Sequence, residues 1–252
     1  MITTVSRADF LDCYWDYRPG EHVALIQPTG GGKTYMAYQL LQRAMADNPH
    51  LSVVSLMPKP SDPATSAWAG KLGLKEIPSW PPRLLLPWQS RPSGYVLWPR
   101  HAKNLPPDKR RELVAAELKK GIDSQYWSGN SITFCDDTHS AAVLMGLNPY
   151  LEELWVNGRA GGAGLWAATQ KPSGTLGTGS VSSFMYSSAS HLFLGRDNDE
   201  RNIRRFGEIG GVDPKLVERI VRDLRVFQVN GHPVSEQLYI DLRGPYMLLI
   251  GP

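Results

Sequence analysis

The feature that most constrains this chain is a glycine-rich turn placed between an apolar run and a stretch with helical character. Residues 27–34 read Gln-Pro-Thr-Gly-Gly-Gly-Lys-Thr and directly follow the apolar run 23–26. Residues 35–41 then favour a helix. A strand, a glycine-rich loop and a helix in this order are the setting of a phosphate-binding loop of the Walker A form, G-x-x-x-x-G-K-[ST], here with Gln27 at the first glycine position.

The residue types of this loop suit a nucleoside triphosphate. Glycines let successive backbone N–H groups turn toward an anion, and the N-terminus of a helix favours negative charge. We expect Lys33 to reach the β- and γ-phosphates and Thr34 to place its hydroxyl on Mg²⁺. ATP and Mg²⁺ are therefore the predicted cofactors. The residues predicted to hold the nucleotide form one continuous segment: Pro28, Thr29, Gly30, Gly31, Gly32, Lys33, Thr34 and Tyr35.

Composition and charge favour one globular intracellular domain. The chain has 252 residues, of which 42% are hydrophobic and 20% charged, enough for a single large α/β domain over 1–252. Its net charge of +3 permits a polyanionic partner without requiring one. No apolar run approaches 18 residues and no signal pattern opens the chain, so we expect no membrane span. Two cysteines, Cys13 and Cys135, make a disulfide framework improbable and favour the cytoplasm.

Apolar runs alternate with helical stretches along most of the chain, which predicts a mostly parallel sheet flanked by helices. The ligand of such a sheet binds at the carboxyl ends of its strands. Residues 1–20 read as a short amphipathic helix and a turn, and residues 226–252 as a C-terminal antiparallel β extension. The predicted strands are 22–26, 51–56, 131–135, 165–170 and 191–195. The predicted longer helices are 33–46, 108–120, 139–157, 198–208 and 213–224.

Residues 57–108 differ from the rest because proline recurs throughout and four tryptophans are interspersed. Proline removes backbone donors, so this segment is predicted to be an irregular insertion with one strand near 95–98. Its aromatic side chains either pack on the sheet edge or form a contact surface for a partner or another subunit. We favour packing on the sheet. A contact surface would require exposed aromatic side chains, and the sequence alone does not show that these side chains are exposed.

Two carboxylates and an amide follow two of the predicted strands. Asp136 and Asp137 end the run Ser131–Cys135, where a Walker B strand would end. We expect Asp136 to hold Mg²⁺ and Asp137 to orient the attacking water, although Asp also favours an ordinary turn. Gln170 ends the next strand, and its amide can bond the γ-phosphate and the water together.

The segment that follows resembles a known family. Residues 158–173 read Gly-Arg-Ala-Gly-Gly-Ala-Gly-Leu-Trp-Ala-Ala-Thr-Gln-Lys-Pro-Ser. This is similar to the part of FtsK/HerA-type DNA translocases in which a Gly-Arg element leads into a strand ending Ala-Thr-Gln-Arg-Pro-Ser. Residues 56–60, Leu-Met-Pro-Lys-Pro, also resemble the Asp-Pro-Lys turn of related conjugation ATPases, with Met57 in place of the acid. The family usually has Asp-Glu at the Walker B end, whereas this chain has Asp-Asp.

The resemblance implies a RecA-like P-loop NTPase that works as a ring, usually a hexamer, with ATP at the subunit boundaries. It also implies an arginine acting across the boundary on transition-state charge. Among the candidates Arg159 and Arg201 are favoured over the rest: Arg196, Arg204 and Arg205. By the same resemblance, residues 172–183 would line a central channel and contact the DNA backbone without reading bases.

These observations predict an ATP hydrolase that translocates or packages double-stranded DNA as a ring homo-oligomer, from a virus or a mobile element. A viral portal or capsid, or a DNA-transfer complex, is an expected further partner, and the host cytoplasm the location if the source is viral. A small-molecule kinase with a lid at 196–205 and a non-motor assembly ATPase switched by ATP remain open. A GTPase is disfavoured because neither D-x-x-G nor N/T-K-x-D stands in place.

Overall fold

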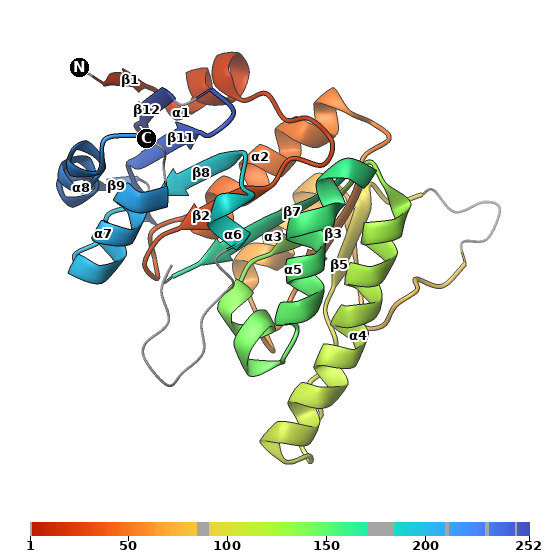
Figure 1. The fold of residues 1–252 in the computed structure, drawn as a ribbon. Helices are drawn as coiled ribbons and strands as arrows, with labels where there is room; N and C mark the ends of the chain where they lie inside the picture. The colour runs from red at the N-terminus through yellow and green to blue at the C-terminus, as the bar shows by residue number, and fades with distance from the viewer. Residues whose placement is uncertain (1, 85–90, 171–183, 210–211, 230–231, 245) are drawn as a thin grey trace.

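A computed structural model of the chain shows a twisted central sheet with helices on both faces (Figure 1). The structure describes residues 2–84, 91–170, 184–209, 212–229, 232–244 and 246–252. The two ends of the chain lie near each other at one side of the sheet. This is the predicted α/β architecture, a mostly parallel sheet flanked by helices.

Among the described residues, ten strands form the main sheet in the order β1-β12-β11-β8-β2-β7-β6-β3-β5-β4. The seven strands from β8 to β4 are parallel, while β11 runs antiparallel to both β8 and β12. A separate antiparallel pair consists of β9 and β10. The strands are β1 (Thr3–Val5), β2 (Val23–Ile26), β3 (Ser52–Leu56), β4 (Leu74–Ile77), β5 (Gly94–Leu97), β6 (Ser131–Cys135), β7 (Ala163–Thr169), β8 (His191–Leu194), β9 (Val226–Val229), β10 (His232–Ser235), β11 (Gln237–Asp241) and β12 (Tyr246–Ile250).

Helices connect most of the parallel strands. The α-helices are α1 (Arg7–Asp9), α2 (Lys33–Asp47), α3 (Pro63–Leu72), α4 (Pro107–Ser128), α5 (Asn148–Asn157), α6 (Phe184–Ser187), α7 (Glu200–Ile209) and α8 (Pro214–Asp223). Two π-helical turns and one 3₁₀ turn complete the set: η1 (Phe10–Tyr14), η2 (Ser140–Leu144) and η3 (Gly158–Gly161). Within the described residues, none of these helices is both long enough and apolar enough to span a bilayer.

Successive side chains of the buried strands point to opposite faces and divide the core in two. In β2, Ala24 and Ile26 join the cluster under α4, α5, α7 and α8, whereas Val23 and Leu25 join the cluster under α2 and α3. Strands covered on both faces are continuous apolar runs rather than alternating ones. The sheet is therefore a rigid platform whose carboxyl ends, at β2, β6 and β7, meet along one edge.

The prediction of an irregular insertion over residues 57–108 is wrong for much of that segment. It contains the ten-residue helix α3 and strand β4, neither of which was predicted, and strand β5, which matches the strand predicted near 95–98; β4 and β5 form one end of the main sheet. Helix α3 starts cleanly because Asp62 caps it and Pro63 occupies its first turn, where a missing N–H is tolerated. The favoured interpretation of the aromatic residues is confirmed for Trp68, which is 7% exposed in the core.

Three further boundaries differ from the sequence prediction. The single helix expected over 139–157 is two elements, η2 and α5, because Gly146 takes a left-handed backbone conformation between them. The N-terminal segment adds strand β1, which was not predicted, and pairs in parallel with β12. The C-terminal extension has the expected antiparallel strands, and two of them, β11 and β12, also join the main sheet.

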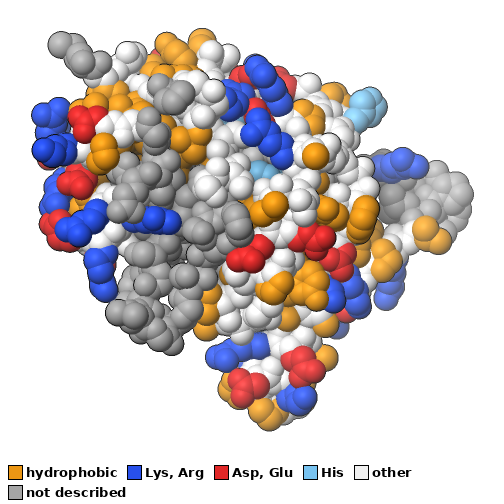
Figure 2. Space-filling model, in the orientation of Figure 1, with side chains coloured by type: hydrophobic (Ala, Val, Ile, Leu, Met, Phe, Trp, Pro, Cys, Tyr) orange, Lys and Arg blue, Asp and Glu red, His pale blue; other side chains and the backbone are white. Residues whose placement is uncertain are grey.

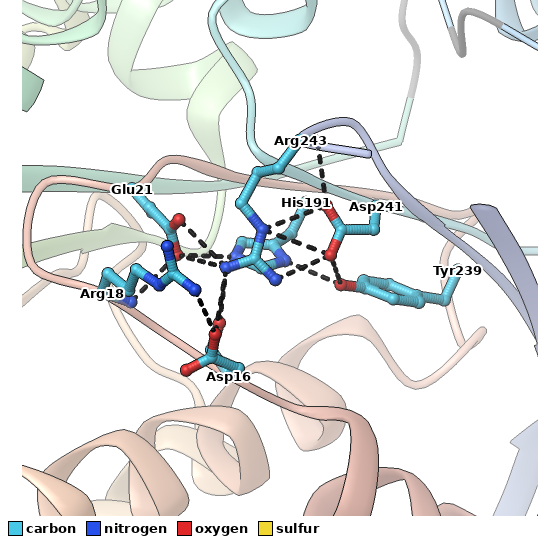
Figure 3. Close-up of polar contacts among 7 residues, drawn as sticks. All are labelled: Asp16, Arg18, Glu21, His191, Tyr239, Asp241 and Arg243. Atoms are coloured by element: carbon cyan, nitrogen blue, oxygen red, sulfur yellow. Dashed lines mark hydrogen bonds and ion pairs between the residues drawn. The ribbon is translucent and has the colours of Figure 1, made fainter. Parts of the chain in front are cut away.

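A buried polar cluster lies at the other side of the sheet from the carboxyl ends of β2, β6 and β7, where β2 and β8 begin (Figure 3). Arg243 lies at its centre and donates to Glu21 at 3.1 Å and to Asp241 at 2.7 Å. The ring nitrogens of His191 lie 3.0 Å from Glu21 and 2.8 Å from the Tyr239 hydroxyl. The cluster therefore ties the N-terminal segment, β8 and the C-terminal hairpin together.

His22, beside this cluster, predicts how stability depends on pH. Its side chain is buried, and its Nδ1 accepts the Leu165 N–H at 2.9 Å, so the ring is neutral. Burial, and then the charge of Arg159, lower the pKa of His22 to about 4. Because the unfolded value is near ~6.5, the unfolded chain binds the proton first, and stability is lost as pH falls from ~6.5 toward that folded value.

We expect His22 to contribute up to about 3 kcal/mol to this loss. The measurement is urea unfolding at several pH values of the wild type and of His22→Asn, whose side-chain oxygen can still accept the Leu165 N–H. The stability advantage of the wild type should shrink as the pH is lowered. An advantage of constant size between pH 7.5 and pH 5 would show that His22 does not titrate in this way.

Candidate nucleotide-binding site

The glycine-rich loop leaves β2 and enters α2 as the sequence predicts. Gly30 and Gly32 have φ values of +78° and +88°, which residues with a side chain rarely adopt. The Lys33 ammonium donates to the carbonyl oxygens of Gln27 at 2.7 Å and Pro28 at 3.0 Å, across the loop. Burial lowers the pKa of Lys33 to about 8, so its side chain is charged at neutral pH. The Lys33 ammonium and the N-terminus of α2 therefore both lie at the glycine-rich loop.

Gln27, at the first glycine position of the motif, is accommodated by a glycine on the neighbouring strand. Gln27 is buried, and its N–H donates to the Thr169 carbonyl at 3.1 Å. A Cβ added to Gly195 would lie 2.4 Å from the Gln27 Cγ. The absence of a side chain at Gly195 therefore makes room for Gln27, and the loop keeps its path with a larger residue at its entry.

A cavity of about 710 Å³ lies at the carboxyl edge of the sheet beside this loop. It brings together residues that are far apart in the sequence, from the ends of β6 and β7 and from the start of α2. Of the predicted site residues it is lined by Thr29, Gly30, Gly32, Lys33, Thr34, Tyr35, Asp136, Asp137 and Gln170. The remaining loop residues, Pro28 and Gly31, belong to the same turn.

Asp136 is the most buried acid at this site, with a side chain that is 1% exposed. One of its carboxylate oxygens accepts the Thr34 hydroxyl at 2.6 Å, and the other accepts the Lys59 ammonium at 3.0 Å. Asp62 lies 3.8 Å from the same ammonium. Lys59 is a member of the site that the sequence did not predict, although it lies in the Met-Pro-Lys-Pro turn that resembles the related conjugation ATPases.

The arrangement predicts that Lys59 stabilises the fold through Asp136. Lys59→Met removes the cation from a buried carboxylate, and we expect a loss of about 1–3 kcal/mol in the free energy of unfolding. Asp136→Asn in the Lys59→Met background removes the stranded charge and should recover most of that loss. Chemical denaturation without nucleotide measures all three variants. If the double variant is as unstable as the sum of the two single variants, Lys59 and Asp136 are not coupled.

Asp137 takes a different position from its neighbour. Its two carboxylate oxygens accept the backbone N–H of Ser140 at 3.1 Å and the Ser140 hydroxyl at 2.8 Å. Asp137 is half-buried and also lines the cavity. The side chain thus caps the turn η2 while facing the site, so the turn role and the catalytic role are compatible.

If Asp137 orients water, Asp137→Asn should bind ATP normally and turn it over ~10²-fold more slowly or worse. The amide keeps an oxygen acceptor for the Ser140 N–H, so the cap is largely preserved. Ser140→Ala is the matched control, because it removes one bond of the cap and leaves the carboxylate. Steady-state hydrolysis together with nucleotide titration separates the two steps. Normal turnover by Asp137→Asn would move the water-orienting role to Gln170.

The remaining predicted residues lie in two places. Gln170 is exposed at the end of β7 and reaches the cavity. Arg159, in η3, lies at the opposite edge of the sheet, where the backbone around it contacts Gly20. It is exposed, and the structure does not bring it to the cavity of its own subunit. The predicted channel segment 172–183 lies outside the described residues.

One wall of the cavity, formed by the two terminal segments of the chain, was not predicted from the sequence. Arg7, from the N-terminal segment, donates to the Ser235 carbonyl at 3.2 Å, and its guanidinium lies 5.9 Å from the centre of the Tyr35 ring. Tyr35 is 48% exposed and meets Trp68 edge-on, with ring centroids 5.3 Å apart. Both ends of the chain therefore reach the site, and no local motif signals such a long-range contact.

The donor set fits the predicted magnesium ion. The Thr34 hydroxyl and one Asp136 oxygen lie within hydrogen-bonding distance of each other beside the loop. Both are oxygen donors, and Mg²⁺ is commonly held by one or two protein oxygens together with substrate phosphates and water. Thr34 and Asp136 are therefore the residues that would hold the ion.

Comparison with known proteins places this geometry in a structural context. No protein-family model matches the chain, and no curated protein sequence matches it. Among solved structures it is similar to the genome packaging NTPase B204 of Sulfolobus turreted icosahedral virus 2. With B204 bound to sulfate the TM-score is 0.61 at 14% identity, over 94% of this chain and 98% of that chain. With B204 bound to ATP-gammaS it is 0.59 at 13%, over 94% and 99%.

The two chains share a fold. A further structure of B204, described as the DNA-packaging ATPase of Sulfolobus turreted icosahedral virus, gives a TM-score of 0.56 at 13% identity, over 94% of this chain and 99% of that chain. The match spans nearly the whole of both proteins. The resemblance noticed in the sequence is confirmed at the level of the fold.

Proposed function

We propose that this protein is an Mg²⁺-dependent ATP hydrolase that drives the movement of double-stranded DNA, with residues 1–252 acting as a single RecA-like ATPase domain. The observation that carries the proposal is the contact between the Thr34 hydroxyl and Asp136 at 2.6 Å. It joins the phosphate-binding loop to the end of β6, as a Walker A and Walker B pair must be joined. Similarity of fold to a viral packaging NTPase supports the choice of DNA as the load.

The proposal assigns a role to each of the residues at the nucleotide cavity. Lys33 and the loop N–H groups bind the β- and γ-phosphates, and Asp137 with Gln170 orients a water in line with the terminal phosphorus. The new bond forms from that water, the bond to the bridging oxygen breaks, and ADP and phosphate leave. Thr34 and Asp136 would hold Mg²⁺, which would supply positive charge beside the phosphate oxygens.

The working form in this proposal is a ring, most simply a hexamer, in the cytoplasm. Arg159 is exposed at the edge of the sheet opposite its own cavity, so any catalytic action of this side chain would be on a neighbouring subunit. Mixing Arg159→Ala subunits with Lys33→Ala subunits should then restore some hydrolysis where intact halves meet. A mixture as inactive as either parent would count against this arginine, and Arg201 would be tested next. A portal, capsid or DNA-transfer complex is the proposed docking partner.

Native mass spectrometry with a non-hydrolysable ATP analogue and short duplex DNA tests the proposal. A motor should give a closed oligomer of one size carrying nucleotide and a single duplex. A small-molecule kinase would form no closed ring and would not bind the duplex. A monomer that binds the analogue but never DNA would overturn the motor assignment while leaving the nucleotide site intact.

A further inference from the structure

A second cavity, which we call the basic groove, lies beyond the carboxyl end of β5, between that strand and the start of α4. It has a volume of about 770 Å³ and is open to solvent. Its lining includes three cations, Arg100, Lys103 and Arg110, together with His101, Pro60 and Ser61. Residues 99–103 were not among the predicted site residues, because nothing in their local pattern marks them.

The cations of the basic groove have no ion-pair partner in the part of the chain that the structure describes. Among the described residues, no carboxylate lies within ion-pair distance of Arg100, Lys103 or Arg110. The acid lining the groove, Glu76, accepts the Ser66 hydroxyl at 2.9 Å. Three cations thus surround one opening with a single acid at its wall.

Cations a short distance away on α4 behave differently. Lys109 pairs with Glu112 at 2.8 Å, and Arg111 pairs with Asp108 at 3.3 Å. Figure 2 shows basic and acidic side chains side by side at the protruding end of α4. Lys109 and Arg111 are therefore locally neutralised, whereas Arg110 on the same helix contributes to the uncompensated charge of the basic groove.

The Arg110 side chain is half-buried in the wall of the groove. One of its terminal guanidinium nitrogens donates to the Leu105 carbonyl at 3.1 Å, which holds the guanidinium in place. A fixed guanidinium without a carboxylate partner favours an anionic oxygen by charge and by charge-assisted hydrogen bonding.

The groove and the nucleotide cavity share a wall. Pro60 and Ser61 line the groove and directly follow Lys59, whose ammonium bonds Asp136 in the other cavity. The Trp98 indole N–H donates to the Lys59 carbonyl at 2.8 Å, and Trp98 also lines the groove. A ligand seated in the groove would therefore contact the segment that carries Lys59, the partner of the proposed metal ligand Asp136.

We propose that the basic groove binds the phosphodiester backbone of double-stranded DNA and is the contact through which DNA influences the nucleotide site. The proposal rests on the function proposed above, which supplies the DNA. Arginine and lysine contacts to phosphate carry no sequence information, so binding is indifferent to base sequence. It also weakens with salt, because each neutralised phosphate releases counterions.

The test compares two double variants that each remove two positive charges. Arg100→Gln/Lys103→Gln removes unpaired groove cations, and Lys109→Gln/Arg111→Gln removes paired cations from the same region. Fluorescence anisotropy with a labelled duplex at several KCl concentrations gives the slope of log K against log[salt]. The slope should fall by about 2 in magnitude in the groove variant and stay unchanged in the control. Hydrolysis without DNA should be normal in both, since none of the four lines the nucleotide cavity.

Each other outcome has a definite meaning. Equal slopes in wild type and groove variant overturn the groove as a DNA site. The same conclusion follows if the groove variant keeps its DNA affinity but loses binding to a labelled polyglutamate peptide, which would assign the groove to an acidic protein segment. Failure of the wild type itself to bind duplex DNA would instead overturn the proposed function.

Discussion

Lys33→Ala is expected to lose ATP hydrolysis almost completely, by ~10²–10³-fold or more, because it removes the cation that faces the transferred phosphoryl group. In the structure this ammonium spans the loop to the Gln27 and Pro28 carbonyls, so its loss also loosens the loop. Nucleotide binding should weaken sharply as well. The measurement is steady-state phosphate release, paired with titration of a fluorescent nucleotide.

Lys109→Ala is a suitable control for this variant. Lys109 is an exposed lysine far from the cavity in sequence, and its partner Glu112 lies on the same helix. It should hydrolyse and bind ATP like the wild type. If Lys33→Ala also turned over ATP at the wild-type rate, the identification of residues 27–34 as the phosphate-binding loop would be wrong.

Arg243→Met is expected to destabilise the protein by about 3–5 kcal/mol, the usual cost of removing one partner from a buried ion pair. Arg243 is the cation shared by Glu21 and Asp241, whose side chains are only 4% and 3% exposed. Without it, two carboxylates remain buried at the start of β2 and the end of β11 (Figure 3). Chemical denaturation of both proteins at neutral pH measures the loss.

Arg222→Met provides the comparison. Arg222 forms a 2.6 Å ion pair with Glu200, but both side chains are well exposed, so solvent already screens the charges and little change in stability is expected. If Arg243→Met cost no more than Arg222→Met, the polar cluster would not hold the N-terminal and C-terminal segments together as its geometry indicates.

The elements that determine the nucleotide site were largely predictable from sequence. The loop at 27–34, Asp136 and Gln170 each directly follow an apolar strand. Because these strands are parallel, their carboxyl ends lie at the same side of the sheet. Local pattern was sufficient there because each part of the motif is contiguous. The roles assigned to Asp137, Gln170 and Arg159 remain predictions.

The parts that escaped prediction depend on long-range contacts. Lys59 reaches Asp136 across 77 positions of sequence, and Arg7 reaches the Ser235 carbonyl across 228. Strand β5 matches the strand predicted near 95–98, whereas α3 and β4 were not predicted because their segment is rich in proline. Tertiary packing makes these residues part of the sheet and the site, and the local sequence pattern of each segment does not indicate this packing.

The rate of ATP hydrolysis measured against duplex DNA concentration tests the central claim most directly. The account predicts a low rate without DNA and a saturable rise as any duplex is added, independent of base sequence, weaker at high salt and absent from Lys33→Ala. A rate that is unchanged across the whole range of DNA concentration, in a protein that hydrolyses ATP, would contradict a DNA motor and favour an ATP-switched assembly protein.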